Sequence, residues 1–276
     1  MRIGLVKTSL VDFPAEVAAA LFIRGCNLRC PYCHNPELVL GPEPPGLLDP
    51  EEVLAFLHRR KNVLGGVCVS GGEPLLHPEL PEFLREIRHL GLKVKLDTNG
   101  TLPEALGRIE ADYIAMDLKT VPEKYGLLAG PAACLPAAGP GSAPPRNGRC
   151  PAEAHAAAGL PAGPAASTDA AAPGADGLAA AVRESAALII DRGGDHEFRT
   201  TAAPGIFDPR DIPAMAEILR GAKRHILAPY RGEKTLDRDY GKNAIPCTME
   251  ELLAFRREFR VRGVDCDLRG ISGEGT

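Results

Sequence analysis

The sequence predicts an α/β fold in which a parallel sheet curls into a partial (β/α)6 barrel. Short apolar runs alternate along the chain with amphipathic segments, an order typical of parallel sheets with crossover helices. Two of the amphipathic segments begin with an acidic N-cap followed by proline, at Asp49-Pro50 and Asp208-Pro209. Six such repeats fall short of the eight that close a barrel, so an open barrel is expected.

The expected strands are short apolar runs, beginning with the entirely apolar segment 17–23. The others are 66–70, 93–97, 113–118, 197–201 and 225–228, with a closing strand at 264–268. Helices are expected where apolar residues recur at helical spacing, as Leu80, Phe83 and Ile87 do. They span 50–60, 80–90, 102–109, 178–190, 209–220 and 249–260, the last after a capping box that starts at Thr248.

Composition excludes several classes of protein. The 276 residues carry a net charge of −4, which disfavours binding to a nucleic-acid backbone. No apolar run approaches the roughly 20 residues of a membrane span, and residues 1–12 lack the apolar core of a secretory signal. A cytoplasmic location is therefore expected. Eight cysteines are too dilute for a disulfide scaffold, so metal ligation or redox chemistry is the better interpretation.

One segment departs from this composition. Ala, Pro and Gly make up 37 of the 52 residues from 129 to 180. Prolines and glycines interrupt helices, and few large apolar side chains are present to offset the entropy of ordering. We expect a single domain over 1–276, interrupted by a disordered or loosely packed insertion at about 130–176. The insertion follows the fourth strand, and its Cys134 and Cys150 are too few to ligate a second cluster.

Polar motifs follow the ends of five predicted strands. They occupy 25–33, 70–74, 97–100, 117–119 and 199–201. Active sites of parallel α/β folds lie at the carboxyl ends of strands, because that edge gathers the loops of the whole sheet. The shared position therefore predicts one site.

Three cysteines in the first of these motifs have the spacing C-x3-C-x2-C, at Cys26, Cys30 and Cys33. Three thiolates on a [4Fe–4S] cluster leave one iron open to a cofactor or substrate. The alternatives are zinc with His34 as fourth ligand, covalent haem at C-x-x-C-H, and a dithiol redox pair. Because Cys33 and His34 are neighbours in sequence, they cannot easily bind the same tetrahedral zinc ion. Covalent haem attachment generally needs export. A dithiol redox pair would leave Cys26 unexplained.

The triplet, followed by Gly-Gly-Glu-Pro at 71–74, resembles the radical S-adenosylmethionine (SAM) superfamily. Further segments resemble the glycyl-radical-enzyme activating proteins, and most closely those of anaerobic ribonucleoside-triphosphate reductase. These segments are KTSLVDFP at 7–14, CHNP at 33–36, DTNG at 97–100 and DLK at 117–119. The resemblance covers about 1–128 and 178–230.

The resemblance implies a role for each matching residue. Cys26, Cys30 and Cys33 would ligate three irons, and the fourth iron would bind the amino and carboxylate groups of SAM. Tyr32 would lie near the adenine. Glycines at 71–72 permit close approach of the backbone to a ligand. The residues expected to face the methionyl amine are Gly71, Gly72 and Glu73.

The later motifs would bind the other end of the cofactor. Asp97, Thr98 and Asp117 would sit beside the methionyl carboxylate, where the equivalent aspartates of relatives hold a monovalent cation. Lys119 and Arg199 are candidates for contacts with the cofactor or with a peptide. The implied barrel is of radical SAM type, and the implied cofactors are a [4Fe–4S] cluster, SAM and a monovalent cation.

The implied activity is reductive cleavage of SAM, followed by formation of a glycyl radical on a partner enzyme. Anaerobic ribonucleoside-triphosphate reductase is the expected partner, and a flavodoxin- or ferredoxin-type protein the expected electron donor. A pyruvate formate-lyase-like partner and a small-molecule substrate are the alternatives. An iron–sulfur electron carrier would not need the Gly-Gly-Glu and Asp-Thr-Asn motifs. Only about 50 residues follow Ala228, which favours a site open to a peptide loop.

Overall fold

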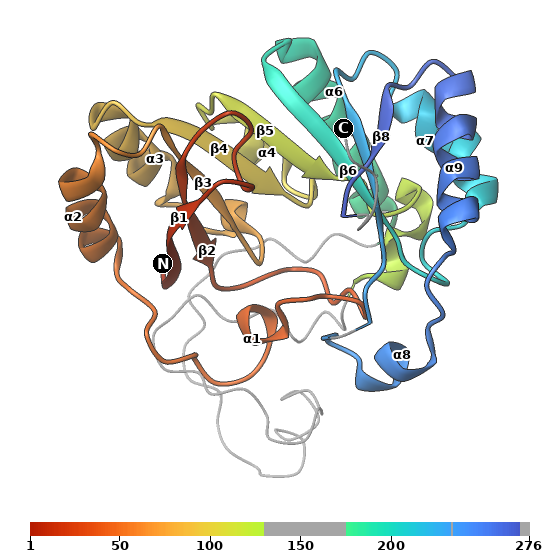
Figure 1. Cartoon of the computed structure of the whole chain (residues 1–276), viewed down its shortest axis with the longest axis horizontal. Helices are drawn as coiled ribbons and strands as arrows, with labels where there is room; N and C mark the ends of the chain where they lie inside the picture. The colour runs from red at the N-terminus through yellow and green to blue at the C-terminus, as the bar shows by residue number, and fades with distance from the viewer. Residues whose placement is uncertain (130–174, 233, 271–276) are drawn as a thin grey trace.

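The computed structural model describes residues 1–129, 175–232 and 234–270. Within them, eight strands form one open sheet in chain order, and Figure 1 shows them as an arc. Strand β1 is antiparallel to β2, and every later pair is parallel. The strands are β1 (Ile3–Ser9), β2 (Ala18–Ile23), β3 (Gly66–Gly71), β4 (Lys93–Thr98), β5 (Tyr113–Asp117), β6 (Asp195–Ala202), β7 (His225–Pro229) and β8 (Cys266–Leu268).

Most helices begin at the proline or cap that the sequence signals. Helix α2 (Pro50–Arg60) carries a capping box on Asp49, and α9 (Met249–Val261) one on Thr248. The other helices are α1 (Pro36–Val39), α3 (Leu80–His89), α4 (Pro103–Gly107), α6 (Ala175–Arg192), α7 (Ile212–Ile218) and α8 (Arg238–Asn243). Short 3-10 helices span Pro74–Leu76, Pro122–Leu127 and Pro209–Asp211. None of the described helices is long and apolar enough to cross a membrane.

The predicted open barrel is confirmed, with differences at its edges. Strand β1 was not expected; its residues 6–8 are exposed, as befits an edge strand. Helix α6 begins at Ala175, three residues before the expected start. The rest of the predicted insertion, at 130–174, lies outside the described residues.

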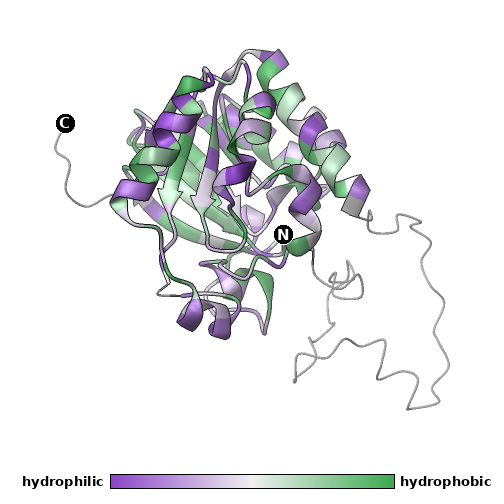
Figure 2. Ribbon diagram, turned by 90° about the vertical axis from the view of Figure 1, so that its right-hand side faces the viewer, coloured by the Kyte–Doolittle hydropathy of each residue, from purple (hydrophilic) through white to green (hydrophobic). Residues whose placement is uncertain are grey.

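The strand register separates an apolar face from a polar face. On one side, residues such as Val69, Leu96 and Phe198 are fully buried and belong to the core with the helices. Figure 2 shows hydrophobic residues along the strands and a mixture of hydrophobic and hydrophilic residues on the outer helices. The opposite, barrel-facing side carries the alternate residues, which include small and charged side chains such as Ala20 and Lys95.

Candidate active site

The three cysteines lie on the loop that leaves β2. The loop is held in place from outside: Arg29 N donates to Leu128 O over 2.7 Å, and Leu28 forms a bridge with Ala129. Within the loop, Cys33 N donates to Cys30 O over 3.0 Å. All three thiols are free, Cys30 is buried and the other two are half-buried. The sequence thus brings three soft ligands onto one ordered segment at the carboxyl edge of the sheet.

Burial keeps these thiols neutral in the absence of a positive partner. It raises the pKa of Cys26 to about 12, and it also raises the pKa of Cys30 and Cys33. Negative charge on a neighbouring cysteine adds to the effect, between Cys26 and Cys30 and between Cys30 and Cys33. Three sulfurs close enough to interact would be stabilised together as thiolates by one cationic group.

The donor set fits a cluster better than a single ion. Among the described residues, no three Cys, His, Asp or Glu side chains converge enough to share one metal ion. Zinc–sulfur bonds of about 2.3 Å would require sulfurs about 4 Å apart, whereas an iron–sulfur cluster takes each thiolate on a different iron. His34, the alternative fourth zinc ligand, is exposed. Cys26, Cys30 and Cys33 would hold a [4Fe–4S] cluster, one iron each.

The glycine pair after β3 packs directly against the start of the cysteine loop. Gly71 has a φ of +126°, and a Cβ there would overlap the backbone of Ile23. A Cβ on Gly72 would overlap the carbonyl oxygen of Gly25. Gly72 N donates to Ile23 O over 2.8 Å, and Glu73 N to Gly25 O over 2.7 Å. The closest backbone approach that these glycines allow is therefore to the segment carrying the cysteines.

The Glu73 carboxylate ties the end of β3 to the end of β4. It is fully buried and accepts from Thr98 Oγ1 over 2.8 Å and from Asn99 N over 2.6 Å. Leu75 N is a third donor at 3.2 Å. Burial raises the pKa of Glu73 to about 7, although these hydrogen bonds oppose the rise. Thr98, expected beside the methionyl carboxylate, directs its hydroxyl to Glu73, on the face of the strand opposite to Asp97.

Asn99 extends this connection to the cysteine loop. Its side-chain nitrogen lies 3.9 Å from Cys26 Sγ and donates to Asn27 Oδ1 over 2.9 Å. Asn27 in turn donates to Thr101 Oγ1 over 2.7 Å. Asn27, Asn99 and Thr101 were not among the predicted site residues. Asn99 could have been found from the sequence, because it lies within the DTNG segment that was singled out there.

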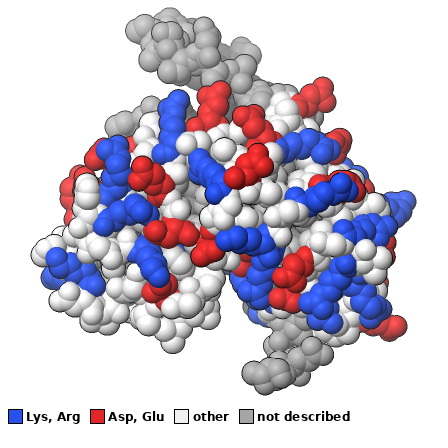
Figure 3. Space-filling model, turned by 90° about the horizontal axis from the view of Figure 1, so that it is seen from above, with Lys and Arg blue, Asp and Glu red and all other residues white. Residues whose placement is uncertain are grey.

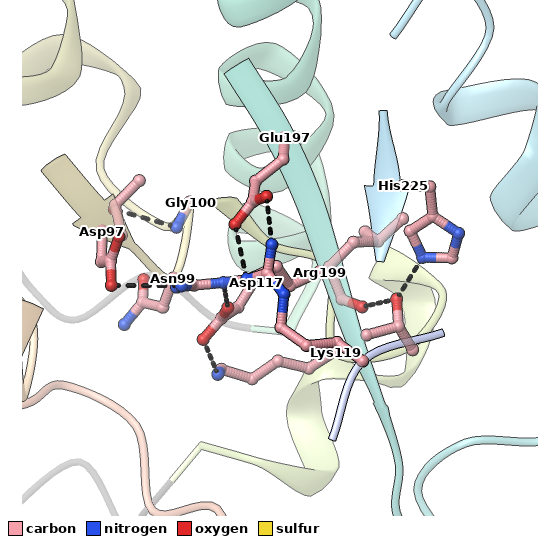
Figure 4. A network of polar contacts seen from close by, with 12 residues as sticks. Asp97, Asn99, Gly100, Asp117, Lys119, Glu197, Arg199 and His225 are labelled. Atoms are coloured by element: carbon pink, nitrogen blue, oxygen red, sulfur yellow. Dashed lines mark hydrogen bonds and ion pairs between the residues drawn. The ribbon is translucent and has the colours of Figure 1, made fainter. Parts of the chain in front are cut away.

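Five charged side chains, hereafter the charged row, alternate in sign on the barrel-facing side of β4, β5 and β6. Asp97 binds Lys95 and, over 3.1 Å, Arg199 Nη1. Asp117 binds Arg199 Nε over 2.9 Å and Lys119 Nζ over 3.0 Å. Figure 4 shows both aspartates reaching Arg199 from neighbouring strands. The structure thus brings together four residues predicted from three separate motifs and adds Lys95, which was not predicted.

The pairing determines the charge of the row. Arg199 and Lys119 hold the pKa of Asp117 well below its ordinary value, in spite of burial. The aspartates raise the pKa of Arg199 and Lys119 far enough to outweigh desolvation. Tyr32, expected near the adenine, is buried, its hydroxyl has no hydrogen-bond partner, and burial raises its pKa well above the ordinary value.

Residues after β7 return to the cysteine loop. Asp237 N donates to Pro31 O over 3.0 Å, and Lys234 pairs with Glu37 over 2.8 Å. Figure 1 shows α8 at the same end of the molecule as α1. Part of the C-terminal segment therefore covers one side of the predicted site.

One hollow in the described part of the chain lies away from these motifs. It measures about 350 Å³ and is lined by residues before β5 and β6, at the amino edge of the sheet. Its cations are paired or capped: Arg88 binds Asp112 over 2.7 Å, and Arg192 donates to Leu106 O. Figure 3, viewed from the end opposite α1 and α8, shows acidic and basic residues interspersed. The chemistry-bearing motifs meet at the other edge.

One family model matches the part of the chain that holds most of these motifs. Residues 21–134, which include the three cysteines and the ends of β3, β4 and β5, match the Radical SAM superfamily. This segment therefore resembles a radical SAM domain. The chain is also similar to curated proteins, and it spans about half the length of the curated relatives it matches.

Three relatives have comparable similarity. A protein named as a glycyl-radical enzyme activating enzyme, from Methanocaldococcus jannaschii, is 36% identical over 130 residues, 44% of this chain and 51% of its own. The pyruvate formate-lyase-activating enzyme of Clostridium pasteurianum is 37% identical over 131 residues, 43% and 52% of the two chains. The 7-carboxy-7-deazaguanine synthase of Methanopyrus kandleri is 36% identical over 129 residues, 39% and 51%.

Solved structures support the fold. A radical SAM methyltransferase from Sphaerobacter thermophilus aligns with a TM-score of 0.58 at 16% identity, covering 98% of this chain and 78% of its own. SuiB of Streptococcus suis, bound to its precursor peptide SuiA, aligns with a TM-score of 0.56 at 13% identity, covering 91% and 48%. The similarity extends over the whole partial barrel.

Proposed function

We propose that the chain is a glycyl-radical-enzyme activating enzyme that cleaves SAM reductively at a [4Fe–4S] cluster. One observation supports this most: the loop with Cys26, Cys30 and Cys33 is joined through Gly72 and Asn99 to strand ends that carry a charged row. A cofactor that contacts both a cluster and a carboxylate-binding site needs the cysteine loop and the charged row on the same edge of the sheet. Relatives named as activating enzymes are 36% and 37% identical to this chain over 130 and 131 residues.

The bound cluster and SAM would together supply a one-electron cleavage that produces a carbon radical able to take a hydrogen atom from glycine. The chain's own residues do the rest. The cysteines hold the cluster, and the backbone of residues 71–72 supports their loop. The charged row presents cations to a carboxylate. Water and oxygen must be excluded around the reacting centre, and the segment after β7 covers one side of it.

The partner we propose is anaerobic ribonucleoside-triphosphate reductase, on the resemblance of the segments at 7–14, 33–36, 97–100 and 117–119. A flavodoxin- or ferredoxin-type electron donor and a cytoplasmic location complete the proposal. A pyruvate formate-lyase-like partner is the alternative within the same class, since an activating enzyme for that protein has a comparable identity.

A small-molecule radical enzyme is the second candidate. A relative named 7-carboxy-7-deazaguanine synthase has almost the same identity over the same length as the activating enzymes. The contact of Asp237 with Pro31 also closes part of the site that a peptide would enter. This candidate predicts cleavage of SAM that depends on a small substrate and not on a protein.

Electron paramagnetic resonance distinguishes the candidates. The protein would be reconstituted with iron and sulfide without air, reduced, and mixed with SAM alone or with each candidate glycyl-radical enzyme. The proposal expects a glycyl radical signal with one partner and formation of methionine in proportion. Cleavage of SAM with no glycyl signal for any partner would contradict the activating role and favour the second candidate.

A further inference from the structure

The charged row contains a lysine for which the predicted chemistry gives no role. Lys95 is 2% exposed, on the barrel-facing side of β4 two residues before Asp97. Its Nζ binds Asp97 Oδ1 and lies 3.6 Å from Cys68 Sγ and 5.9 Å from the centre of the Tyr113 ring. A buried ion pair contributes little net stability, because desolvation offsets the attraction. The charge of Lys95 therefore calls for a functional explanation.

Every carboxylate oxygen in the row has a cationic partner, so a metal cation that shared these oxygens would lie directly beside other positive charges. Asp97 has Lys95 on Oδ1 and Arg199 on Oδ2. Asp117 has Arg199 on Oδ1 and Lys119 on Oδ2. A metal cation bound between these strands would need several of the same oxygens as ligands. The residues present do not fit a monovalent cation, although the family resemblance implied one.

The remaining predicted ligand is directed elsewhere. The Thr98 hydroxyl donates to Glu73 and accepts from Gly100 N over 3.2 Å, on the other face of β4. Three cations and two carboxylates leave the row with one net positive charge. That charge matches a single carboxylate arriving from a ligand, so no added metal ion is required for neutrality.

We infer that Lys95, together with Arg199, supplies from within the chain the positive charge that a monovalent cation would bring, and that the site binds an amino-acid carboxylate without added metal. This inference rests on the proposed function for the identity of the ligand. The observation that supports the inference is that, among the described residues, each carboxylate oxygen of the charged row has a cationic partner.

The test compares SAM binding and stability in three chloride salts at equal ionic strength. The salts are potassium, sodium and tetramethylammonium, the last too large for a carboxylate-lined site. The dissociation constant of SAM for the anaerobically reconstituted protein is measured in each. The thermal midpoint of the protein without SAM is measured in the same series.

For the wild type we expect dissociation constants within about twofold of one another and thermal midpoints that do not depend on the cation. Lys95→Met should weaken SAM binding in tetramethylammonium by about tenfold, and potassium or sodium should recover part of the loss. Lys95→Arg should bind as the wild type does. Lys93→Met is the matched control, because Lys93 is exposed on the same strand and pairs with Glu16.

The outcomes separate the inference from the proposed function. The wild type could bind SAM tenfold more weakly in tetramethylammonium, or its thermal midpoint could rise specifically with potassium or sodium. Either result would show that the protein contains a metal site. The inference would then be wrong, and the proposed function would stand. A wild type that binds SAM in none of the salts contradicts the proposed function. The wild-type midpoints then still decide whether the row accepts a metal cation, even where Lys95→Met does not fold.

Discussion

The side-chain amide of Asn99, at the end of β4, lies 3.9 Å from the Sγ of Cys26, on the loop after β2. The backbone N–H of Leu28 approaches the same sulfur at 3.4 Å. Two hydrogen-bond donors to one thiolate favour its charged form. The stabilisation that they provide increases with the negative charge of a cluster bound there. The DTNG segment is thereby connected to the cysteine loop as well as to the charged row.

Removing the Asn99 donor should lower the reduction potential of the cluster. Hydrogen bonds to ligating sulfurs stabilise the more negative reduced state. Asn99→Asp keeps an oxygen that can accept from Thr101 but loses the donor to Cys26, so we expect a decrease of roughly 40 mV or more. Potentiometric titration followed by electron paramagnetic resonance measures it. Asn62→Asp, at an exposed position, is the control, and an unchanged potential in Asn99→Asp would refute the role.

Each of the three loop cysteines should be required for iron binding. The reconstituted wild type is expected to hold about four irons per chain, because one cluster is predicted. Cys26→Ala, Cys30→Ala and Cys33→Ala should each lose most of the iron and the brown colour. Cys247→Ala, at a half-buried position outside the loop, should retain both. About eight irons in the wild type would instead show a second cluster.

Gly72→Ala should disturb the cysteine loop without touching a ligand. The added methyl would overlap the carbonyl oxygen of Gly25, so backbone must shift at a cost of about 1–3 kcal/mol or more. We expect a lower unfolding free energy and incomplete iron incorporation. Gly107→Ala is the matched control, since a Cβ there meets nothing within 4 Å and alanine suits a helix. Equal iron content in the two variants would contradict this explanation.

Stability should depend on pH through Glu73. Its pKa is about 7 in the folded chain and about 4.5 when exposed, so the folded state retains the proton over that interval. The stabilising contribution is complete below about pH 4.5 and is lost as pH rises through about 7, a change on the order of 3 kcal/mol. Urea unfolding of the metal-free protein should show this decrease. The decrease should be absent in Glu73→Gln, whatever the variant's overall stability, and its persistence would assign it to another group.

The sequence by itself determined most of the elements and the placing of three cysteines on one loop. Apolar spacing and caps such as Asp49 and Thr248 act over a few residues, so they specify helices and strands locally. The spacing of Cys26, Cys30 and Cys33 likewise places three thiols on one loop wherever that loop lies. Strand β1 was missed because an edge strand tolerates polar residues. Here Lys7 and Thr8 interrupt the apolar run.

The tertiary structure decided how the motifs meet. The meeting of Asp97, Asp117 and Arg199 depends on the register of three parallel strands and on the curl of the sheet. From the sequence alone, Lys95 is only one residue of a predicted strand. Its neighbours across the sheet are known only from the tertiary structure. Glycines 71 and 72 face a loop nearly fifty residues earlier, a relationship no local pattern records. Contacts between distant segments depend on how the whole sheet packs, and that packing is a property of the entire chain.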